Sequence, residues 1–329
     1  MRWPRGTKLR RIARCAAQRI VPGSLILLYH RVAENAADPW SLCVTPRHFA
    51  EHLEVLRGRV VRLTELRGES GGGRAIGRLA ITFDDGYADT LLVARPLLER
   101  HETPATVFVS TGGVNDGKPF WWDELTALLA TPRDLPASLD LCVRGKRQRF
   151  ESGPRVEPCT ESDAWAPHRI RLHHQLHSLL GALDAASRRE QLATLREWVG
   201  GTESPPTARV LTRSEIARLG GDGLVEIGAH TVSHPTLPSL EPDEQEREIR
   251  DSQSLLAAVA GRPITSFAYP HGRHDVTTRR VVRRAGFERA CTSRFGTVGP
   301  YTDALRLPRL EVPDCDGEVF NKILRRLAF

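Results

Sequence analysis

The chain has 329 residues, of which 40% are hydrophobic and 26% are charged, with a formal net charge of +7. This composition indicates a soluble globular protein with a sizeable core, and no apolar run approaches the roughly 18 residues of a membrane span. The six cysteines are scattered without a Cys-x-x-Cys pair, which argues against a structural zinc site and a disulfide framework. We therefore expect reduced thiols in a cytoplasmic protein.

The N-terminal segment is rich in arginine. Residues 1–22 are expected to form a basic helix, and the part from Lys8 to Ile20 is amphipathic enough to lie on a membrane surface. This predicts peripheral contact with the inner face of the membrane; a solvated terminal helix is the alternative. No nucleic-acid motif or glycine-rich phosphate loop is present, so nucleic acid is not an expected partner.

Residues 23–329 are expected to form one domain of alternating strands and helices. Thr45 and Pro46 are typical of an N-cap followed by a first helical residue, and Pro96 is expected to kink its helix. In the first part we expect strands at 24–30, 59–63, 78–83 and 104–110, and helices at 45–57 and 87–100.

The alternation of strands and helices stops at about residue 112 and resumes at about 210, which predicts a largely helical insertion. Within it we expect a helix from about 120, a hairpin at 139–150, and helices at 165–180 and 185–199. The helix expected at 165–180 carries four histidines, and their spacing indicates a solvated helix face rather than a metal site. They are His168, His173, His174 and His177.

Repeated strand–helix units follow the insertion. We expect strands at 224–228, 264–269, 287–292 and 309–312, and helices at 214–219, 241–260, 275–285 and 317–327. Strand–helix–strand order implies parallel pairing with right-handed crossovers, so the fold class is an α/β barrel with its site at the carboxyl ends of the strands.

Two adjacent carboxylates, Asp84 and Asp85, follow the apolar strand that ends at Phe83, and Gly86 follows them. Neighbouring side chains of a strand point to opposite faces, so the two carboxylates can share a site only where the strand gives way to a loop. Two close carboxylates repel each other, and at least one needs a cation or a proton nearby. The alternative is a solvated turn with a helix-capping aspartate.

A second pair of chemical groups, His230 and His234, follows the strand at 224–228. Their four-residue spacing lets the two imidazoles meet on one side of a turn, and Pro235 makes that turn tight. Both pairs follow strands and should lie on one rim of the barrel. Two imidazoles and one carboxylate form a catalytic metal arrangement, and the second carboxylate can then accept a proton from the attacking water.

These motifs carry a family resemblance. Thr82-Phe83-Asp84-Asp85-Gly86, His230-Thr231-x-x-His234 and Phe267-Ala268-Tyr269-Pro270-His271-Gly272 resemble, in order, the first three motifs of the NodB-homology polysaccharide deacetylases, carbohydrate esterase family 4. The resemblance covers about residues 24–110 and 210–315. It implies a deformed (β/α) barrel and metal-dependent removal of acetyl groups from a sugar.

By this resemblance Asp84 is the general base, while Asp85, His230 and His234 hold a divalent metal. Zinc is the expected ion, with cobalt, manganese and nickel as alternatives. Tyr269 is expected to supply a backbone N–H to the oxyanion.

The chain also departs from the family pattern. The usual arginine upstream of the third motif is missing, and Arg309 is the candidate to orient Asp84; an ordinary surface arginine is the alternative. The late Leu-x-His, which usually supplies the general acid, is replaced by Leu307-Pro308-Arg309. His30, at the end of the first strand, is the candidate acid, as in the resembling poly-N-acetylglucosamine deacetylases; a hydrogen-bonded strand-end histidine is the alternative.

Three residues are candidate substrate contacts. Trp121 and Trp122 could stack on a sugar ring, with core packing as the competing interpretation, and Pro270 lies in the third motif. The sequence therefore predicts an enzyme that removes acetyl groups from N-acetylhexosamine units of a glycan or polysaccharide precursor. The alternatives are a non-catalytic glycan-binding protein on a degenerate fold, and a hydrolase of O-acetyl groups or other amides at the same site.

Overall fold

The computed structural model of the chain describes residues 23–34, 38–66, 77–130, 135–143, 145–153, 167–201, 208–327 and 329. The basic helix expected at 1–22 lies outside the described residues. The described residues form two compact units: one lies within Met1–Glu34, Leu42–Lys118 and Val210–Phe329, the other within Asn35–Ser41 and Pro119–Arg209. None of the described helices combines the length and the apolar character that a membrane crossing requires.

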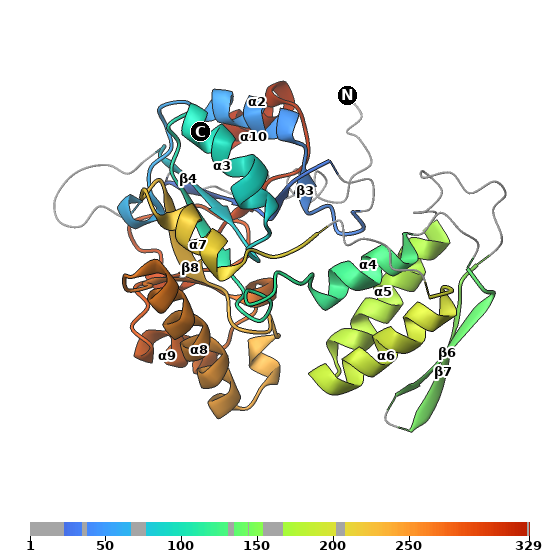
Figure 1. The fold of residues 1–329 in the computed structure, drawn as a ribbon. Coiled ribbons are helices and arrows are strands. Elements are labelled where there is room, and N and C mark those ends of the chain that lie inside the picture. Colours follow the sequence, from blue (N-terminus) through green and yellow to red (C-terminus); the bar gives the residue numbers. More distant parts are fainter. Residues whose placement is uncertain are drawn as a thin grey trace. The chain divides into compact units, whose positions relative to one another are not determined.

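A seven-stranded, all-parallel sheet forms the centre of the first unit (Figure 1). Its strand order is β10-β9-β8-β5-β4-β1-β11, so strands far apart in the sequence become neighbours. The strands are β1 (Leu25–Tyr29), β4 (Leu79–Phe83), β5 (Ala105–Val109), β8 (Val225–Ala229), β9 (Ser266–Ala268), β10 (Arg289–Cys291) and β11 (Leu310–Glu311). Two short strands, β2 (Arg31–Val32) and β3 (Cys43–Val44), pair separately.

The two edges of this sheet approach each other at Leu307, just before β11. The N–H of Leu307 donates to the carbonyl of Ala290 at 2.9 Å, and its carbonyl accepts from the N–H of Thr292 at 2.8 Å. Because β10 and β11 are the edge strands, these bonds curl the sheet toward closure. The expected deformed (β/α) barrel is thereby confirmed.

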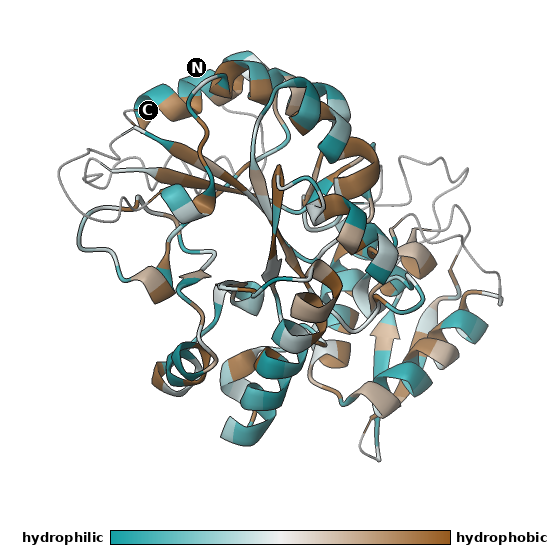
Figure 2. Cartoon of the chain, turned by 60° about the vertical axis from the view of Figure 1, so that its left-hand side comes forward, coloured by the Kyte–Doolittle hydropathy of each residue, from teal (hydrophilic) through white to brown (hydrophobic). Residues whose placement is uncertain are grey.

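Strand alternation divides the buried side chains into an inner and an outer layer. Ile26, Ala80, Phe108 and Ala268 belong to a cluster inside the barrel, whereas their neighbours along the strands join the larger core under the helices. The strands are mostly brown and the helices alternate between brown and teal in Figure 2. Gly228 leaves room for the ring of Phe108, since a Cβ there would lie 2.4 Å from Cδ1 of that ring.

Six helices accompany the strands of the first unit among the described residues: α2 (Pro46–Leu56), α3 (Arg95–Arg100), α7 (Arg213–Gly220), α8 (Pro242–Ala260), α9 (Val276–Arg284) and α10 (Gly317–Arg326). The helix start expected at Thr45 is confirmed, because its side chain accepts the N–H of His48. Short 3₁₀ turns lie at η1 (Leu63–Glu65), η4 (Leu237–Ser239), η5 (Pro270–Gly272) and η6 (Ala304–Arg306).

One local prediction is refined by the structure and another is wrong. The single helix expected at 87–100 begins instead with a π-helical turn, η2 (Thr90–Ala94), in which Arg95 donates to the carbonyl of Thr90. Pro96 lacks an N–H and its ring crowds the carbonyl four residues earlier, so a wider turn before it relieves the conflict. The strand expected at 59–63 is reduced to one bridge between Val60 and Leu79, followed by η1.

The second unit has its own hydrophobic core. It contains α4 (Trp121–Leu129), the antiparallel hairpin of β6 (Ser138–Val143) and β7 (Lys146–Glu151), α5 (Pro167–Gly181) and α6 (Ala185–Trp198). Leucines at helical spacing on α4, α5 and α6 pack with the inward side chains of β6. Residues 38–41, which the sequence does not join to the insertion, belong to this unit.

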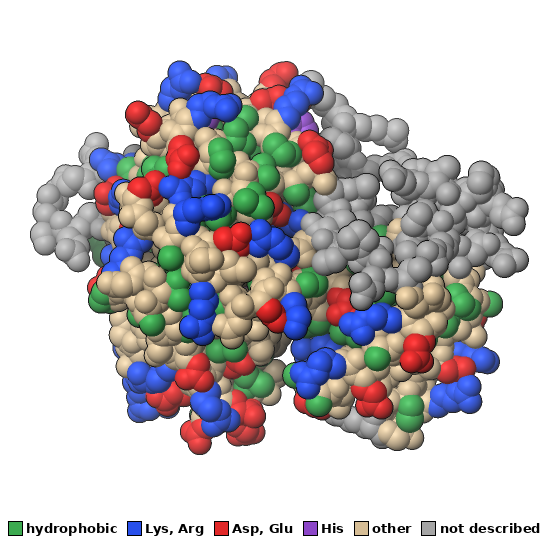
Figure 3. Space-filling view, viewed as in Figure 1, with side chains coloured by type: hydrophobic (Ala, Val, Ile, Leu, Met, Phe, Trp, Pro, Cys, Tyr) green, Lys and Arg blue, Asp and Glu red, His purple; other side chains and the backbone are tan. Residues whose placement is uncertain are grey.

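Charged side chains of both signs are interspersed on the face of the molecule drawn in Figure 3. The positive net charge is therefore not gathered into one single-sign field on that face. The four cysteines among the described residues, Cys43, Cys142, Cys291 and Cys315, are free thiols.

Candidate active site

Asp84 reaches the barrel interior by simple strand alternation. Ala80 points inward on β4, so Thr82 and Asp84 follow on the same side. The N–H of Asp84 donates to the carbonyl of Tyr29 at 3.0 Å, which extends the pairing of β4 with β1 by one residue. Asp84 is 4% exposed, so the solvated-turn alternative does not hold.

Asp85 joins the same site because the backbone turns sharply after the strand. Its φ is 71°, in the left-handed region, and Gly86 follows with a φ of 83°. A side chain at Gly86 would place its Cβ 2.8 Å from Cγ1 of Val109, so glycine is required there by space as well as by conformation. The left-handed aspartate is strained, and such strain is typical of a functional turn.

The two histidines sit in an irregular loop after β8 rather than on a helical turn. Thr231 and His234 have φ values of 67° and 56°. The hydroxyl of Thr231 accepts the N–H of His234 at 3.1 Å and donates to the carbonyl of His230, which closes the loop on itself. The four-residue spacing thus brings the imidazoles together through a tight loop.

Glu248 on α8 holds this loop from outside. Its carboxylate accepts the N–H groups of Val232 and Ser233 at 2.8 and 2.9 Å and the hydroxyl of Ser233 at 2.6 Å. Sequence reasoning assigned this residue only to a long charged helix. The contact spans 15 or 16 residues along the chain, and no local pattern signals it.

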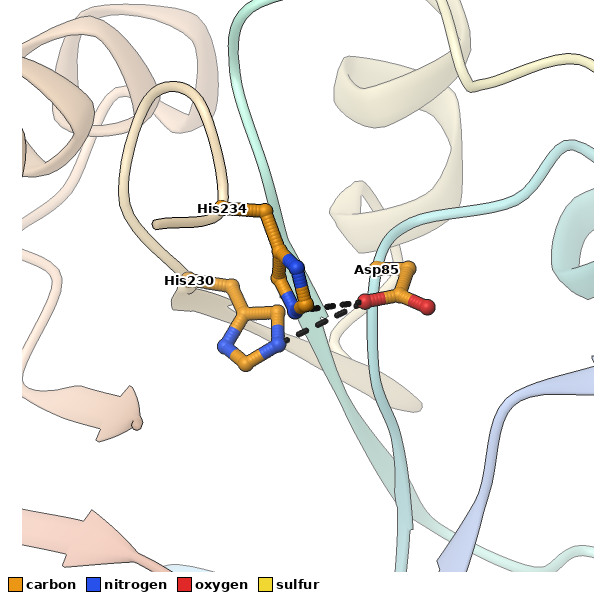
Figure 4. Close-up of side chains that lie close together, drawn as sticks. All are labelled: Asp85, His230 and His234. Atoms are coloured by element: carbon orange, nitrogen blue, oxygen red, sulfur yellow. Dashed lines mark ion pairs between the residues drawn. The ribbon is translucent and has the colours of Figure 1, made fainter. Parts of the chain in front are cut away.

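Asp85, His230 and His234 point toward one another (Figure 4). Oδ1 of Asp85 lies 3.4 Å from Nε2 of each histidine, and the three ligand atoms lie within 4.8 Å of one another. The four histidines of α5 do not form such a group in the described part of the chain. The residues that could hold a metal ion are therefore those expected from the sequence.

The donor chemistry of this group fits a metal ion. Nδ1 of His230 lies 2.8 Å from the carbonyl of Ala268, which can only accept, so that nitrogen carries the proton. In the neutral imidazole Nε2 then faces Asp85 with a lone pair, and the two acceptors oppose each other unless a metal ion or a proton lies between them. Buried Oδ1 of Asp85 accepts no hydrogen bond among the described residues. The three ligand atoms lie within 4.8 Å of one another, so these residues could hold one divalent ion together.

Arg309 clamps Asp84 with a bidentate pair. Its two terminal nitrogens donate to the two carboxylate oxygens at 2.7 and 2.6 Å, and its Nε donates to the carbonyl of Thr292 at 2.8 Å. One terminal nitrogen also lies 3.2 Å from the hydroxyl of Thr82. Arg309 is 1% exposed, so it is not an ordinary surface arginine.

The charges around Asp84 keep it ionised. Burial alone would raise the pKa of Asp84, but the guanidinium of Arg309 outweighs burial and, together with His230 when that imidazole is protonated, holds the pKa below its ordinary value. Burial likewise opposes the charge of Asp85, and the two histidines of the group lower its pKa. Both carboxylates are therefore available as anions at neutral pH.

His30 lies beside this pair on the same rim. It follows β1, whose last residue, Tyr29, accepts the N–H of Asp84. His30 is partly buried, and it is among the groups that lower the pKa values of Asp84 and Asp85. The structure thus brings together the candidate acid, which the sequence placed more than 50 residues away, and the candidate base.

The role expected for Tyr269 is wrong in this structure. Its backbone N–H donates to the carbonyl of Cys291 at 3.0 Å and is committed to the pairing of β9 with β10. Its side chain is buried and donates to the carbonyl of Leu305 at 3.0 Å. Neither group is free to meet an oxyanion at the rim.

His271 contributes a third imidazole to the site. Its ring centroid lies 4.6 Å from that of His234, at 69°. Its backbone has a φ of 55°, which the following Gly272 continues with a φ of 65°. The sequence places His271 in the third motif but does not predict its contact with His234, because that contact depends on the order of β8 and β9 in the sheet.

The expected substrate contacts of three residues are not supported. Trp122 is 8% exposed and stacks on Phe120 at 4.3 Å, which is core packing in the second unit. The ring of Trp121 is covered by the guanidinium of Arg188 at 4.8 Å and by His177 at 4.9 Å. Pro270 is buried at the start of η5, where its fixed φ shapes the turn.

Comparisons with known proteins agree with this site. A family model described as polysaccharide deacetylase matches residues 176–290, which include His230 and His234 but not Asp84 or Asp85. A Bacillus subtilis (strain 168) protein with the name "Putative polysaccharide deacetylase YxkH" is 25% identical over 118 residues. That match covers 36% of this chain and 42% of the relative.

Two solved structures share the fold over nearly their whole length. The Streptococcus pyogenes deacetylase PplD, in complex with acetate, matches with a TM-score of 0.57 and 18% identity, covering 92% of this chain and 99% of that one. IcaB from Ammonifex degensii matches with a TM-score of 0.56 and 19% identity, covering 94% and 98%. The matched region and the shared fold make the chain similar to the polysaccharide deacetylases, in agreement with the resemblance of its three motifs to the NodB-homology family, carbohydrate esterase family 4.

Proposed function

We propose that the chain is a metal-dependent hydrolase that removes acetyl groups from N-acetylhexosamine units of a glycan or polysaccharide precursor. The observation that carries this proposal is the buried Asp84, clamped by Arg309, beside the group of Asp85, His230 and His234. A glycan-binding protein without activity has no need for an ionised, oriented carboxylate next to a metal site.

Asp84 acts as the general base. The bidentate pair with Arg309 fixes the plane of its carboxylate and keeps it ionised, so that it can take a proton from the attacking water. Asp85, His230 and His234 hold the metal, zinc by the proposal, which when bound polarises the acetyl carbonyl and lowers the pKa of a water. Glu248 keeps the histidine loop in the conformation that this requires.

His30 acts as the general acid. An amine leaves a tetrahedral carbon only when its nitrogen is protonated, so amide hydrolysis requires a proton donor opposite the base. His30 lies on the rim beside Asp84, and the late histidine that usually serves the family is absent from this chain.

The direct test is acetate release from a panel of glycans by the purified full-length protein, with metal analysis of the same sample. We expect release from N-acetylated hexosamine oligosaccharides and about one divalent ion per chain. Removal of the ion by a chelator should stop acetate release, and zinc should restore it. Activity that persists in metal-free protein would contradict the proposed role of the Asp-His-His group.

The panel also separates the alternatives. Glycan binding without acetate release, in protein loaded with zinc, cobalt, manganese or nickel, would favour a non-catalytic binder. Release from O-acetylated but not from N-acetylated sugars would assign the site to ester hydrolysis.

The replacement His30→Gln is expected to lower kcat for an N-acetylated glycan by about 100-fold, because the departing amine loses its proton donor. Metal content should not change, since His30 is not a ligand. An aryl acetate such as p-nitrophenyl acetate has a leaving group that needs no protonation, so its hydrolysis should fall far less.

His274→Gln is the matched control for His30→Gln. His274 stacks on the buried ring of Tyr269 at 4.7 Å and lies outside the Asp-His-His group. The His274→Gln variant should retain turnover on the glycan and on the aryl ester. Equal losses on the glycan and on the aryl ester in His30→Gln would show that His30 does not act as the acid.

A further inference from the structure

Three exposed arginines lie around the loops that follow β9 and β10. Arg273 follows the turn η5, Arg294 lies in the loop after β10, and Arg306 ends η6. Within the described ranges, none of these three side chains forms an ion pair or a hydrogen bond. Exposed arginines are normally solvated, so the informative observation is that these three uncompensated charges lie in the loops at the carboxyl ends of β9 and β10.

The loop that carries Arg294 is hydrogen-bonded to Arg309, the partner of the proposed base Asp84. The carbonyl of Thr292 accepts from Nε of Arg309 at 2.8 Å, and the carbonyl of Arg294 accepts from the backbone N–H of Arg309 at 2.9 Å. Since Arg309 clamps Asp84, the backbone of Arg294 is held at a fixed place beside the general base.

The same loop is also hydrogen-bonded to His271, which contacts His234 of the Asp-His-His group. The hydroxyl of Ser293 donates to the carbonyl of His271 at 3.2 Å, and the ring of His271 contacts that of His234. The packing is close: a Cβ at Gly272 would lie 2.2 Å from Oγ of Ser293. The loop that carries Arg294 is therefore fixed both to Arg309, which pairs with Asp84, and to His271, which contacts His234.

Positive charge converges at this edge of the barrel. Burial lowers the pKa of His274 first, and Arg306, Arg279 and Arg294 lower it further. Arg279 is paired with Asp303 at 3.2 Å, whereas Arg294 and Arg306 have no such partner in the part of the chain described. The uncompensated charge is that of the two arginines.

We propose that Arg294, supported by Arg306, binds an anionic group on the glycan, a phosphate or a carboxylate, next to the acetylated sugar. A guanidinium presents its N–H groups in a planar fork that matches both kinds of anion. The proposal rests on the deacetylase function above and names its substrate class: acetylated glycans that carry negative charge, as uronate residues or as a phosphate.

The test compares oligosaccharides of equal length that contain N-acetylhexosamine and either a uronate or a neutral sugar, together with an N-acetylhexosamine 1-phosphate and its unphosphorylated form. For each, kcat/KM of acetate release and Kd by calorimetry are measured on the full-length, metal-loaded protein. We expect about a tenfold preference for one anionic member over its neutral partner at low salt, shrinking as salt screens the charges. The pair that shows the preference identifies the source of the anion.

Arg294→Glu should abolish or reverse this preference and leave kcat/KM for the neutral glycan within about twofold, because the base and the metal group are not altered. Arg306→Glu should reduce the preference for anionic glycans by a smaller amount. If Arg294→Glu does not fold, Arg306→Glu serves as the test of the proposal. Arg218→Glu is the matched control: it makes the same change in charge at an exposed position in the last turn of α7, at the opposite end of the parallel strands.

Equal kcat/KM and Kd for the anionic and neutral members of both pairs would overturn the proposal. So would a loss in Arg294→Glu that is the same for charged and neutral glycans, which indicates a structural role only. If no glycan yields acetate, the proposed function fails, and the Kd comparison still decides whether Arg294 binds anions.

Discussion

The replacement Asp84→Asn is expected to lower kcat for acetate release by about 10³- to 10⁴-fold, the upper range for loss of a general base. An amide cannot accept a proton from the attacking water, but it has the size of the carboxylate and leaves Asp85, His230 and His234 in place. Metal content measured on the same sample should therefore remain at the level of the unchanged protein.

Asp89→Asn is the matched control for Asp84→Asn. Asp89 also faces a buried arginine, with Oδ2 at 2.8 Å from Nε of Arg31, so both substitutions break an Asp–Arg pair of similar depth. Both should lower the free energy of unfolding, but only Asp84→Asn should abolish acetate release. Comparable turnover in the two variants would remove Asp84 from the role of base.

The replacement Arg309→Met is expected to lower the free energy of unfolding by about 3–5 kcal/mol, the range for removing one partner of a buried ion pair. The cost arises because Asp84 stays buried after the guanidinium is lost, and it must take up a proton or remain an unpaired charge. Acetate release should fall as well, since a protonated Asp84 is no base. Denaturant unfolding followed by circular dichroism measures the first effect.

The double variant Asp84→Asn/Arg309→Met separates the pair from the packing of its side chains. With both charges gone no buried charge is left unpaired, so part of the stability lost in Arg309→Met should return. A double variant as unstable as the sum of the single ones would show that the two side chains act independently.

The Asp84–Arg309 pair should also make the free energy of unfolding of the unchanged protein depend on pH in the acid range. The folded-state pKa of Asp84 is lowered below its ordinary value of about 4, so the pair contributes its full stability above that pH. The contribution is lost as pH falls through the lowered pKa. Arg309→Met lacks this contribution, and its stability should depend less on pH in the acid range.

The sequence alone was enough to predict most helices and strands and the grouping of Asp85 with His230 and His234. Helix starts such as Thr45 and strands such as Leu79–Phe83 are local: a cap lies within three residues of its partner, and strand periodicity is visible in one short run. Asp85 and His230 each follow an apolar strand directly. Because the carboxyl ends of parallel strands share one rim, their meeting could be foreseen without knowing the strand order.

Only the tertiary structure decided which side chain pairs with Asp84 and which backbone groups are already hydrogen-bonded within the sheet. The partners Arg309 and Asp84 lie 225 residues apart, and their contact depends on the closure of the sheet between β10 and β11. The N–H of Tyr269 is consumed by the pairing of β9 with β10, which no local pattern fixes. Strand order and register arise from packing of the whole core, so the residues that tune the base and hold the histidine loop appear only once the chain has folded.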